Sequence, residues 1–74
     1  MERTKFKYYE QRPCKFIFRN GKKVFGVIWE SNLFKNSIYY FATAGEFKQR
    51  QKDNQVLTGF QVYLDDVIHA ELLK

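Results

Sequence analysis

The feature that most restricts how this chain can fold is a β-hairpin expected at Asn20-Gly21. The residues before it, Cys14–Arg19, alternate around Phe16 and Phe18, and those after it, Lys23–Glu30, are rich in β-branched and aromatic residues. Asn-Gly between two such runs is the strongest short-range hairpin signal and predicts a type I′ turn with two positive-φ residues. The chain is therefore expected to be all-β and mainly antiparallel.

The second strand of this hairpin is apolar on both faces. Its two apolar sets are Val24 and Ile28 on one face, and Phe25, Val27 and Trp29 on the other. Gly26 lies between them, where a missing side chain permits a sharp bend or a bulge. A long, bent strand that is buried on both faces predicts a small, strongly bent barrel, because a flat sheet with one solvated face would need only one apolar side.

Three more strands are expected, which makes a five-stranded barrel. They are Ser37–Thr43, a fourth strand at Val56-Leu57 and Phe60–Leu64 with a break at Gly59, and Val67–Leu73. The last segment could also be a helix begun by Asp65. Its apolar and polar residues alternate as in a strand, and we favour a strand because four strands alone would leave the barrel unclosed. Residues 45–55 are expected to form a long polar loop or the tip of a hairpin. Residues 1–13 are expected to be peripheral, as an edge strand or a short helix.

The length and composition fit one small domain over residues 1–74. The net charge is +5, but residues 1–35 hold nine basic and three acidic side chains, a net +6, and residues 36–74 hold four and five, a net −1. One cysteine, no apolar leader and no apolar run of roughly 20 residues predict a cytoplasmic protein without a membrane segment. A strongly basic half can attract a polyanion.

No residue pattern indicates catalysis, a metal or another cofactor. Cys14 and His69 are the only thiol and imidazole, and nothing in their spacing joins them as nucleophile and base. Asp65-Asp66 is typical of a turn, because two adjacent carboxylates are too few ligands for a cation. The chain is therefore expected to be a binding module and not an enzyme.

Basic and aromatic residues are interleaved in the N-terminal half, as in proteins that track phosphates with Lys or Arg and stack bases on rings. The candidate contact residues are Lys5, Lys7, Tyr8, Tyr9, Arg12, Arg19, Lys22, Lys23 and Phe34. The aromatic and aliphatic residues assigned instead to the core are Phe16, Phe18, Phe25, Ile28 and Phe41. The expected partner is RNA or single-stranded nucleic acid. The alternative is protein–protein interaction or homo-oligomeric assembly, with itself or another protein as partner.

Two segments resemble the motifs of the Sm-like family, which includes a bacterial RNA chaperone. Residues 16–31 are similar to the first motif, in which an Asn-Gly turn is followed by a strand with a mid-strand Gly, and residues 61–72 to the second. The resemblance implies a bent five-stranded barrel, as in SH3-like folds also, and places Phe34 near the family's base-stacking aromatic. Where bacterial members have Tyr-Lys-His to contact RNA, this chain has Tyr63-Leu64-Asp65.

Overall fold

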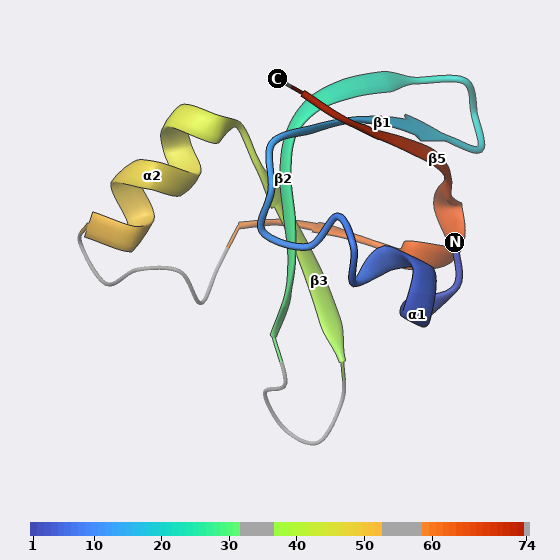
Figure 1. Cartoon of the computed structure of the whole chain (residues 1–74), viewed down its shortest axis with the longest axis horizontal. Coiled ribbons are helices and arrows are strands. Elements are labelled where there is room, and N and C mark those ends of the chain that lie inside the picture. The colour runs from blue at the N-terminus through green and yellow to red at the C-terminus, as the bar shows by residue number, and fades with distance from the viewer. Residues whose placement is uncertain (32–36, 53–58, 74) are drawn as a thin grey trace.

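The fold is a five-stranded antiparallel sheet with the strand order β4-β3-β2-β1-β5 (Figure 1). A computed structural model describes residues 1–31, 37–52 and 59–73. The strands are β1 Cys14–Phe18, β2 Lys23–Ser31, β3 Ile38–Ala42, β4 Phe60–Val62 and β5 Val67–Leu72. Two α-helices, α1 Arg3–Phe6 and α2 Ala44–Lys52, and a 3-10 turn, η2 Leu64–Asp66, complete the described elements.

Strand β2 bends at Gly26 and belongs to both halves of the sheet. Residues 23–26 pair with β1, and residues 27–31 pair with β3 (Figure 1). At the two edges lie β4 and β5, and no ladder joins them within the residues that the structure describes. The predicted antiparallel five-stranded sheet is thus confirmed, but closure into a barrel is not. Strand β4 is only three residues long and is followed closely by η2, so it offers little backbone for pairing with β5.

The hairpin forms at the predicted place with a different turn. The N–H of Gly21 donates to the carbonyl of Phe18 at 2.8 Å, and the N–H of Phe18 donates to the carbonyl of Lys22 at 2.9 Å. Gly21 has φ +86°, whereas Asn20 is not among the positive-φ residues, so the predicted type I′ turn is wrong. The loop is the three-residue kind, in which only the last residue is left-handed. The side chain of Asn20 accepts a hydrogen bond from the N–H of Lys22 at 2.9 Å.

The sheet carries one apolar cluster on each of its faces. The inner cluster is built from Phe6, Cys14, Phe16, Ile28, Tyr39, Val62, Leu64, Val67 and Ala70. The outer one consists of Val27, Trp29, Ala42 and Phe47, and it lies under α2 on the β2–β3 half. The two-faced apolar pattern of β2 is therefore satisfied by a helix on the far side. Phe25 was expected in the core but is 58% exposed, because α2 does not extend over the β1–β2 half.

Helix α1 attaches the N-terminal segment to the inner cluster. Phe6 is 1% exposed, and its ring meets the ring of Tyr39 edge-on at 5.3 Å between centroids. The amine of Met1 donates to the carbonyls of Leu64 and Val67 at 2.9 and 2.8 Å. Residues 1–13 are therefore not wholly peripheral, and of the two expected forms the short helix is the one present.

Helix α2 replaces most of the loop or hairpin tip expected at residues 45–55. Thr43 and Glu46 form a capping box: the Thr43 N–H donates to Glu46 Oε1 at 3.0 Å, and the Glu46 N–H donates to Thr43 Oγ1 at 3.2 Å. One apolar contact, Phe47 on Trp29 at 5.1 Å between ring centroids, then holds the helix on the sheet. Helix α2 is mostly polar, because its one buried side chain, that of Phe47, is enough to attach it to the sheet. Residues 53–55 lie outside the described part of the chain.

Replacement of Thr43 by alanine tests this cap. We expect Thr43→Ala to lower the free energy of unfolding by about 1 kcal/mol, as for other helix N-caps. Hydrogen bonds from Thr43 hold the pKa of the Glu46 carboxyl below its ordinary value of 4.5. The stabilisation that the ionised Glu46 carboxylate gives the folded state is therefore present above pH 4.5, and it is lost as the pH falls through the folded-state pKa. Urea unfolding at neutral and acid pH measures both effects, and Thr4→Ala in α1 is the control. Thr43→Ala leaves the bond from the Thr43 N–H to Glu46 in place, so the result that would contradict the cap is a Thr43→Ala protein as stable as Thr4→Ala at neutral pH.

Candidate functional site

The candidate contact residues from the sequence fall into two groups in the structure. Lys5, Lys7, Tyr8, Tyr9 and Arg12 lie in α1 and the turns that follow it. Arg19, Lys22 and Lys23 lie at the β1–β2 turn. Phe34 lies outside the described residues. The predicted set is therefore split between two elements, and each group is considered by its own contacts.

In the α1 group the rings already contact one another and a cation. The Tyr8 and Tyr9 rings meet edge-on at 5.0 Å between centroids, and the Arg12 guanidinium lies 5.3 Å from the centroid of Tyr8. Tyr9 packs partly against the inner cluster, whereas Tyr8 is 59% exposed. Lys5 and Lys7 are exposed. This group thus exposes one ring on which a base could stack, that of Tyr8, and the guanidinium of Arg12 already lies over that ring.

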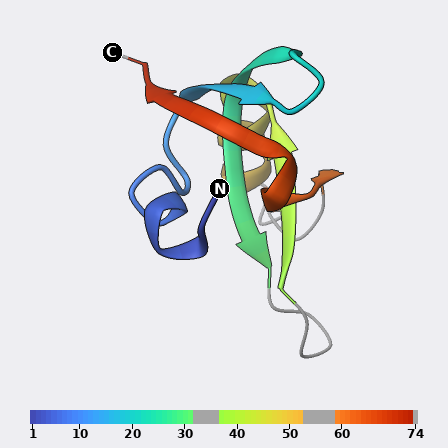
Figure 2. The same ribbon diagram turned by 90° about the vertical axis from the view of Figure 1, so that its right-hand side faces the viewer.

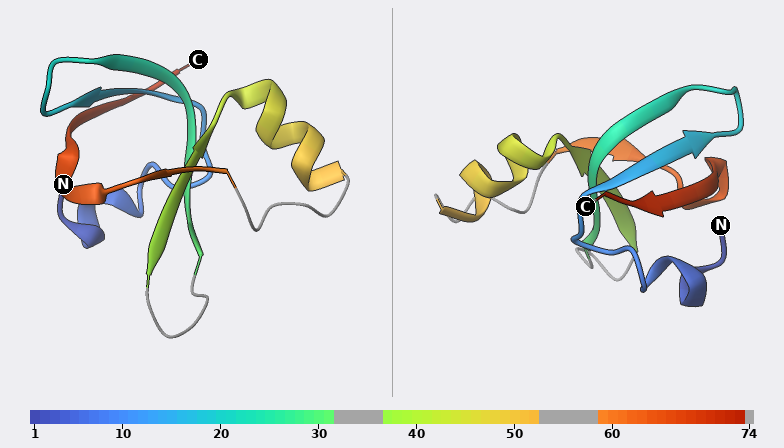
Figure 3. Two further views of the ribbon diagram at one scale, coloured as in Figure 1. Left: turned by 180° about the vertical axis from the view of Figure 1, so that it is seen from behind. Right: turned by 45° about the horizontal axis from the view of Figure 1, so that its top comes forward.

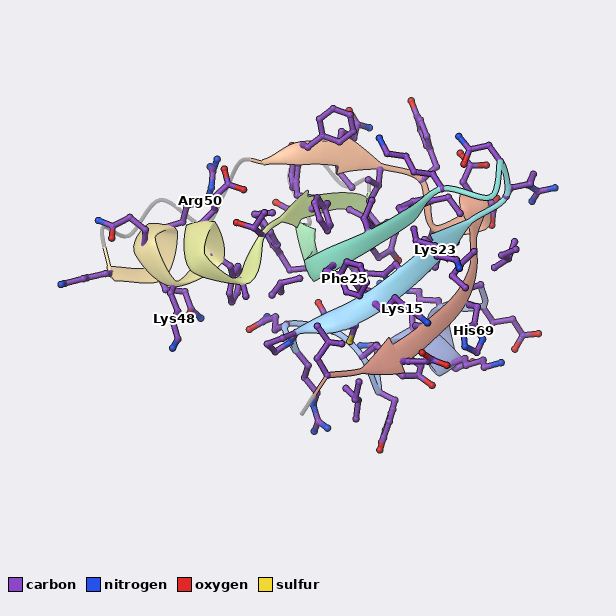
Figure 4. The ribbon with its side chains drawn as sticks, turned by 90° about the horizontal axis from the view of Figure 1, so that it is seen from above. Lys15, Lys23, Phe25, Lys48, Arg50 and His69 are labelled. Carbon is purple, nitrogen blue, oxygen red and sulfur yellow. The ribbon has the colours of Figure 1, made fainter. Side chains whose placement is uncertain are left out.

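In the hairpin group, Arg19 fixes the turn to η2. Its Nη2 donates to the carbonyl of Asp65 at 2.7 Å, its Nε lies 3.8 Å from Asp66 Oδ1, and its own N–H donates to the carbonyl of Asp66 at 2.7 Å. Lys23 is exposed on the outer face of the sheet, near Lys15 and Phe25 (Figure 4). Lys22 instead borders a groove, together with Arg19.

This groove, called here the hairpin–β4 groove, lies between the β1–β2 turn, β4 and the first turns of α2. Figure 3 (left) shows the side of the molecule on which β4 crosses β3, with the hairpin beyond it. The groove is open to solvent and has a volume of about 910 Å³. Its apolar lining comes from Phe18, Val24, Phe41, Ala42 and Val62, and its charged lining from Arg19, Lys22, Glu46, Arg50 and Asp66. An apolar groove with a few polar groups is the usual form of a ligand site.

Two exposed aromatic rings stand at this groove. Phe60, at the start of β4, is 73% exposed, and Tyr63, just before η2, is 65% exposed. Sequence reasoning placed both in the fourth strand and outside the candidate contact set, although Tyr63 matches the Tyr of the Sm-like run that contacts RNA, and it left Arg50 in a loop. The missed signal was their position next to breaks in the strand, at Gly59 and Asp65, since residues at strand ends escape burial more readily than those in the middle.

The groove combines surfaces for stacking with cations for phosphates. Arg19, Lys22 and Arg50 outnumber Glu46 and Asp66, so the charged lining carries a net +1. Arg19 is oriented by its contacts with η2, so one cation is held in place before a ligand arrives. Such an arrangement binds an anionic ligand with planar groups, because rings provide contact area and cations provide long-range attraction.

The thiol and the imidazole lie on opposite faces of the sheet. Cys14 is buried in the inner cluster, and this burial raises the pKa of its thiol. His69 is exposed on the outer face, where its Nε2 lies 3.2 Å from Glu71 Oε1. In the described residues no three His, Cys, Asp or Glu side chains gather as metal ligands. Among these residues too, no helix has the length and apolar character needed to cross a membrane.

Tyr39, another aromatic residue of the third strand, does not reach the groove. It belongs to the inner cluster at 9% exposure, and burial raises the pKa of its phenol, with the Glu30 carboxylate adding to the effect. Of the sequence candidates that the structure describes, Arg19 and Lys22 alone line the groove. The chain matches no model of a protein family, no curated protein and no solved structure in the three comparisons made.

Proposed function

We propose that this chain is a non-catalytic binding module that holds RNA or single-stranded DNA in the hairpin–β4 groove. The observation that carries the proposal is that Phe60 and Tyr63 stand exposed beside Arg19, Lys22 and Arg50. Bases of a single strand can stack on the two rings while phosphates approach the cations. The overall charge of +5 favours the approach of a polyanion.

The same proposal includes a small barrel of the Sm-like or SH3-like kind. Its support is the strand order β4-β3-β2-β1-β5, with β2 shared by both halves through its bend at Gly26. The barrel would be open between β4 and β5. A reducing, cytoplasmic setting is also part of the proposal, and the single buried thiol of Cys14 is compatible with it.

Titration of a labelled, unstructured oligonucleotide tests the groove directly. Loss of one base–ring stack is worth about 1–3 kcal/mol, so Tyr63→Ala and Phe60→Ala should each weaken binding by roughly 5- to 150-fold. The matched control is Tyr8→Ala, because Tyr8 is 59% exposed and Tyr63 is 65% exposed. We expect the control to bind like the unmodified protein. Equal losses in Tyr8→Ala and Tyr63→Ala would move the site away from the groove.

Salt dependence separates phosphate contacts from general attraction. If Lys22 contacts a phosphate, Lys22→Ala should reduce the slope of log affinity against log salt by about 1. Lys48→Ala is the control, since Lys48 is exposed on α2 and does not line the groove. Absence of binding to both RNA and DNA at low salt would refute the nucleic-acid role and leave protein interaction as the function to pursue.

A further inference from the structure

Within the described part of the chain, β5 pairs with β1 on one side and with no strand on the other, so this outer edge is available for pairing with another strand. The bond from the Phe18 N–H to the Lys22 carbonyl shows that even-numbered residues of β1 bond to β2. The Leu73 N–H donates to the Pro13 carbonyl at 3.0 Å, so odd-numbered residues of β5 bond to β1. Antiparallel ladders alternate in this way, so Ala70 and Leu72 direct their N–H and C=O groups away from the sheet.

This edge has few of the features that protect edge strands from pairing. It contains no proline and no lysine between Val67 and Leu72, and Ile68 and Leu72 are 58% and 38% exposed. A bulge at Ile68 ends the regular ladder with β1 on that side, which leaves His69 to Leu72 as the regular part. Figure 2 shows β5 lying across the front of the sheet in that view.

The sequence of β5 is complementary to itself in one register. With Ala70 opposite Ala70 of a second copy, each His69 lies opposite a Glu71, and each Leu72 comes next to the exposed, bulged Ile68 of the other copy. A shift of the centre to His69 would pair His69 with itself, and a shift to Glu71 would pair two carboxylates, which is unfavourable. If the two strands shifted by an odd number of residues, the outward N–H and C=O groups of one copy would face residues of the other copy whose own N–H and C=O groups bond to β1.

We propose that β5 pairs antiparallel with β5 of a second copy of this chain, about a two-fold axis through Ala70. A two-fold interface requires a patch that complements itself, and this register provides it. Each copy carries a net charge of +5, which opposes association in general. The edge counters that repulsion locally, because the Glu71 carboxylate, which lies 3.0 Å from Lys15 of its own copy, would also face the imidazole of His69 of the other copy.

Disulfide trapping tests the register. His69 and the opposite Glu71 form a non-hydrogen-bonded pair, in which Cβ atoms lie roughly 4.5–5.5 Å apart, close to the reach of a disulfide. His69→Cys and Glu71→Cys proteins, mixed and oxidised by oxidised glutathione, should give a crosslinked dimer of one copy of each. Each variant alone should crosslink several-fold less. Both positions are exposed, so neither change disturbs the core, and the buried Cys14 gives the same background in every sample.

Light scattering over a dilution series gives the second readout. The unmodified protein should pass from monomer to dimer as its concentration rises, and Ile68→Lys should remain a monomer at the top of the series. Phe25→Lys is the matched control, because Phe25 and Ile68 are both 58% exposed, and Phe25 points outward from β2 away from the edge (Figure 4). We expect the control to dimerise normally.

Three outcomes would overturn the proposal. The first is a protein that stays monomeric at all concentrations and gives no crosslink in the mixture. The second is equal crosslinking in each single variant and in the mixture. The third is a dimer that is lost in Phe25→Lys but kept in Ile68→Lys. The last would assign association to the outer face of the sheet. None of these readouts involves nucleic acid, so failure of this proposal and failure of the groove's proposed function are distinguishable.

Discussion

Replacement of Gly26 by alanine is expected to lower the free energy of unfolding by more than about 4 kcal/mol. A Cβ built on Gly26 would overlap the backbone carbonyl oxygen of Ala42 and lie 2.7 and 2.8 Å from two ring carbons of Phe41. The carbonyl belongs to β3, which pairs with β2 immediately beyond the bend, so relief requires that the two strands separate. A domain of this size has a total stability of about 4–11 kcal/mol. A clash with backbone is among the changes whose cost exceeds about 4 kcal/mol.

Gly45→Ala is the matched control for this change. Gly45 lies in α2, and a Cβ there meets nothing within 4 Å. Because alanine is the better helix former by about 1 kcal/mol, this variant should be slightly more stable than the unmodified protein. Urea unfolding followed by tryptophan fluorescence measures both, since Trp29 is buried beside the bend. A cooperative transition of unchanged midpoint in Gly26→Ala would show that the strands do not approach so closely.

Replacement of Phe6 by alanine is expected to lower the free energy of unfolding by about 3–5 kcal/mol, the usual range for a buried phenylalanine. The side chain is 1% exposed and lies in the inner cluster against Tyr39. Helix α1 has only four residues and is too short to form by itself, so it depends on its attachment to the sheet, in which this ring is joined by the Met1 amine bonds and the Arg3–Glu30 ion pair. The loss would remove a large part of the total stability and bring Tyr39 into contact with water.

The control for Phe6→Ala is Tyr8→Ala, two residues further along the chain. Tyr8 is 59% exposed, and its truncation should change the free energy of unfolding by less than about 0.5 kcal/mol. Thermal and urea unfolding compare the two variants. If both change the stability equally little, then α1 does not dock on the sheet in solution as described.

The β-strands were predictable because their signals are local. Alternation around Phe16, the Asn20-Gly21 pair and the bend at Gly26 identified the hairpin and its bent second strand within two residues of their bounds. The last strand was predicted from the alternation of Ile68, Ala70 and Leu72 together with the need for a fifth strand, and the strand is confirmed although Ile68 and Leu72 are exposed. Even here the turn type was wrong, because Asn-Gly fits two loop conformations and the bonds of Phe18 decide between them.

Helix α2 was not predictable from polarity, because its stability depends on a distant contact. A segment with one buried residue is typical of a loop unless that residue finds a partner, and the partner of Phe47 is Trp29, on another strand. The Thr43–Glu46 capping box was visible in the sequence, but such a pair is informative only when a helix follows. The prediction that Phe25 is buried was wrong for the same reason, since α2 covers only the β2–β3 half of the outer face and Phe25 lies on the β1–β2 half.

The hairpin and its charges were thus determined by the sequence, whereas the candidate site was decided by the tertiary structure. Lys22 and Arg19 could be named from the sequence because they are local to the Asn20-Gly21 turn. Phe60 lies in β4 and Tyr63 directly after it, three places from β1 in the strand order, and they line the same groove as Arg19 and Lys22 because β2 bends at Gly26 between its β1-paired and β3-paired parts. Hydrophobic patterning states which side chains prefer burial, but the pairing of distant strands decides which aromatic rings remain exposed beside which cations.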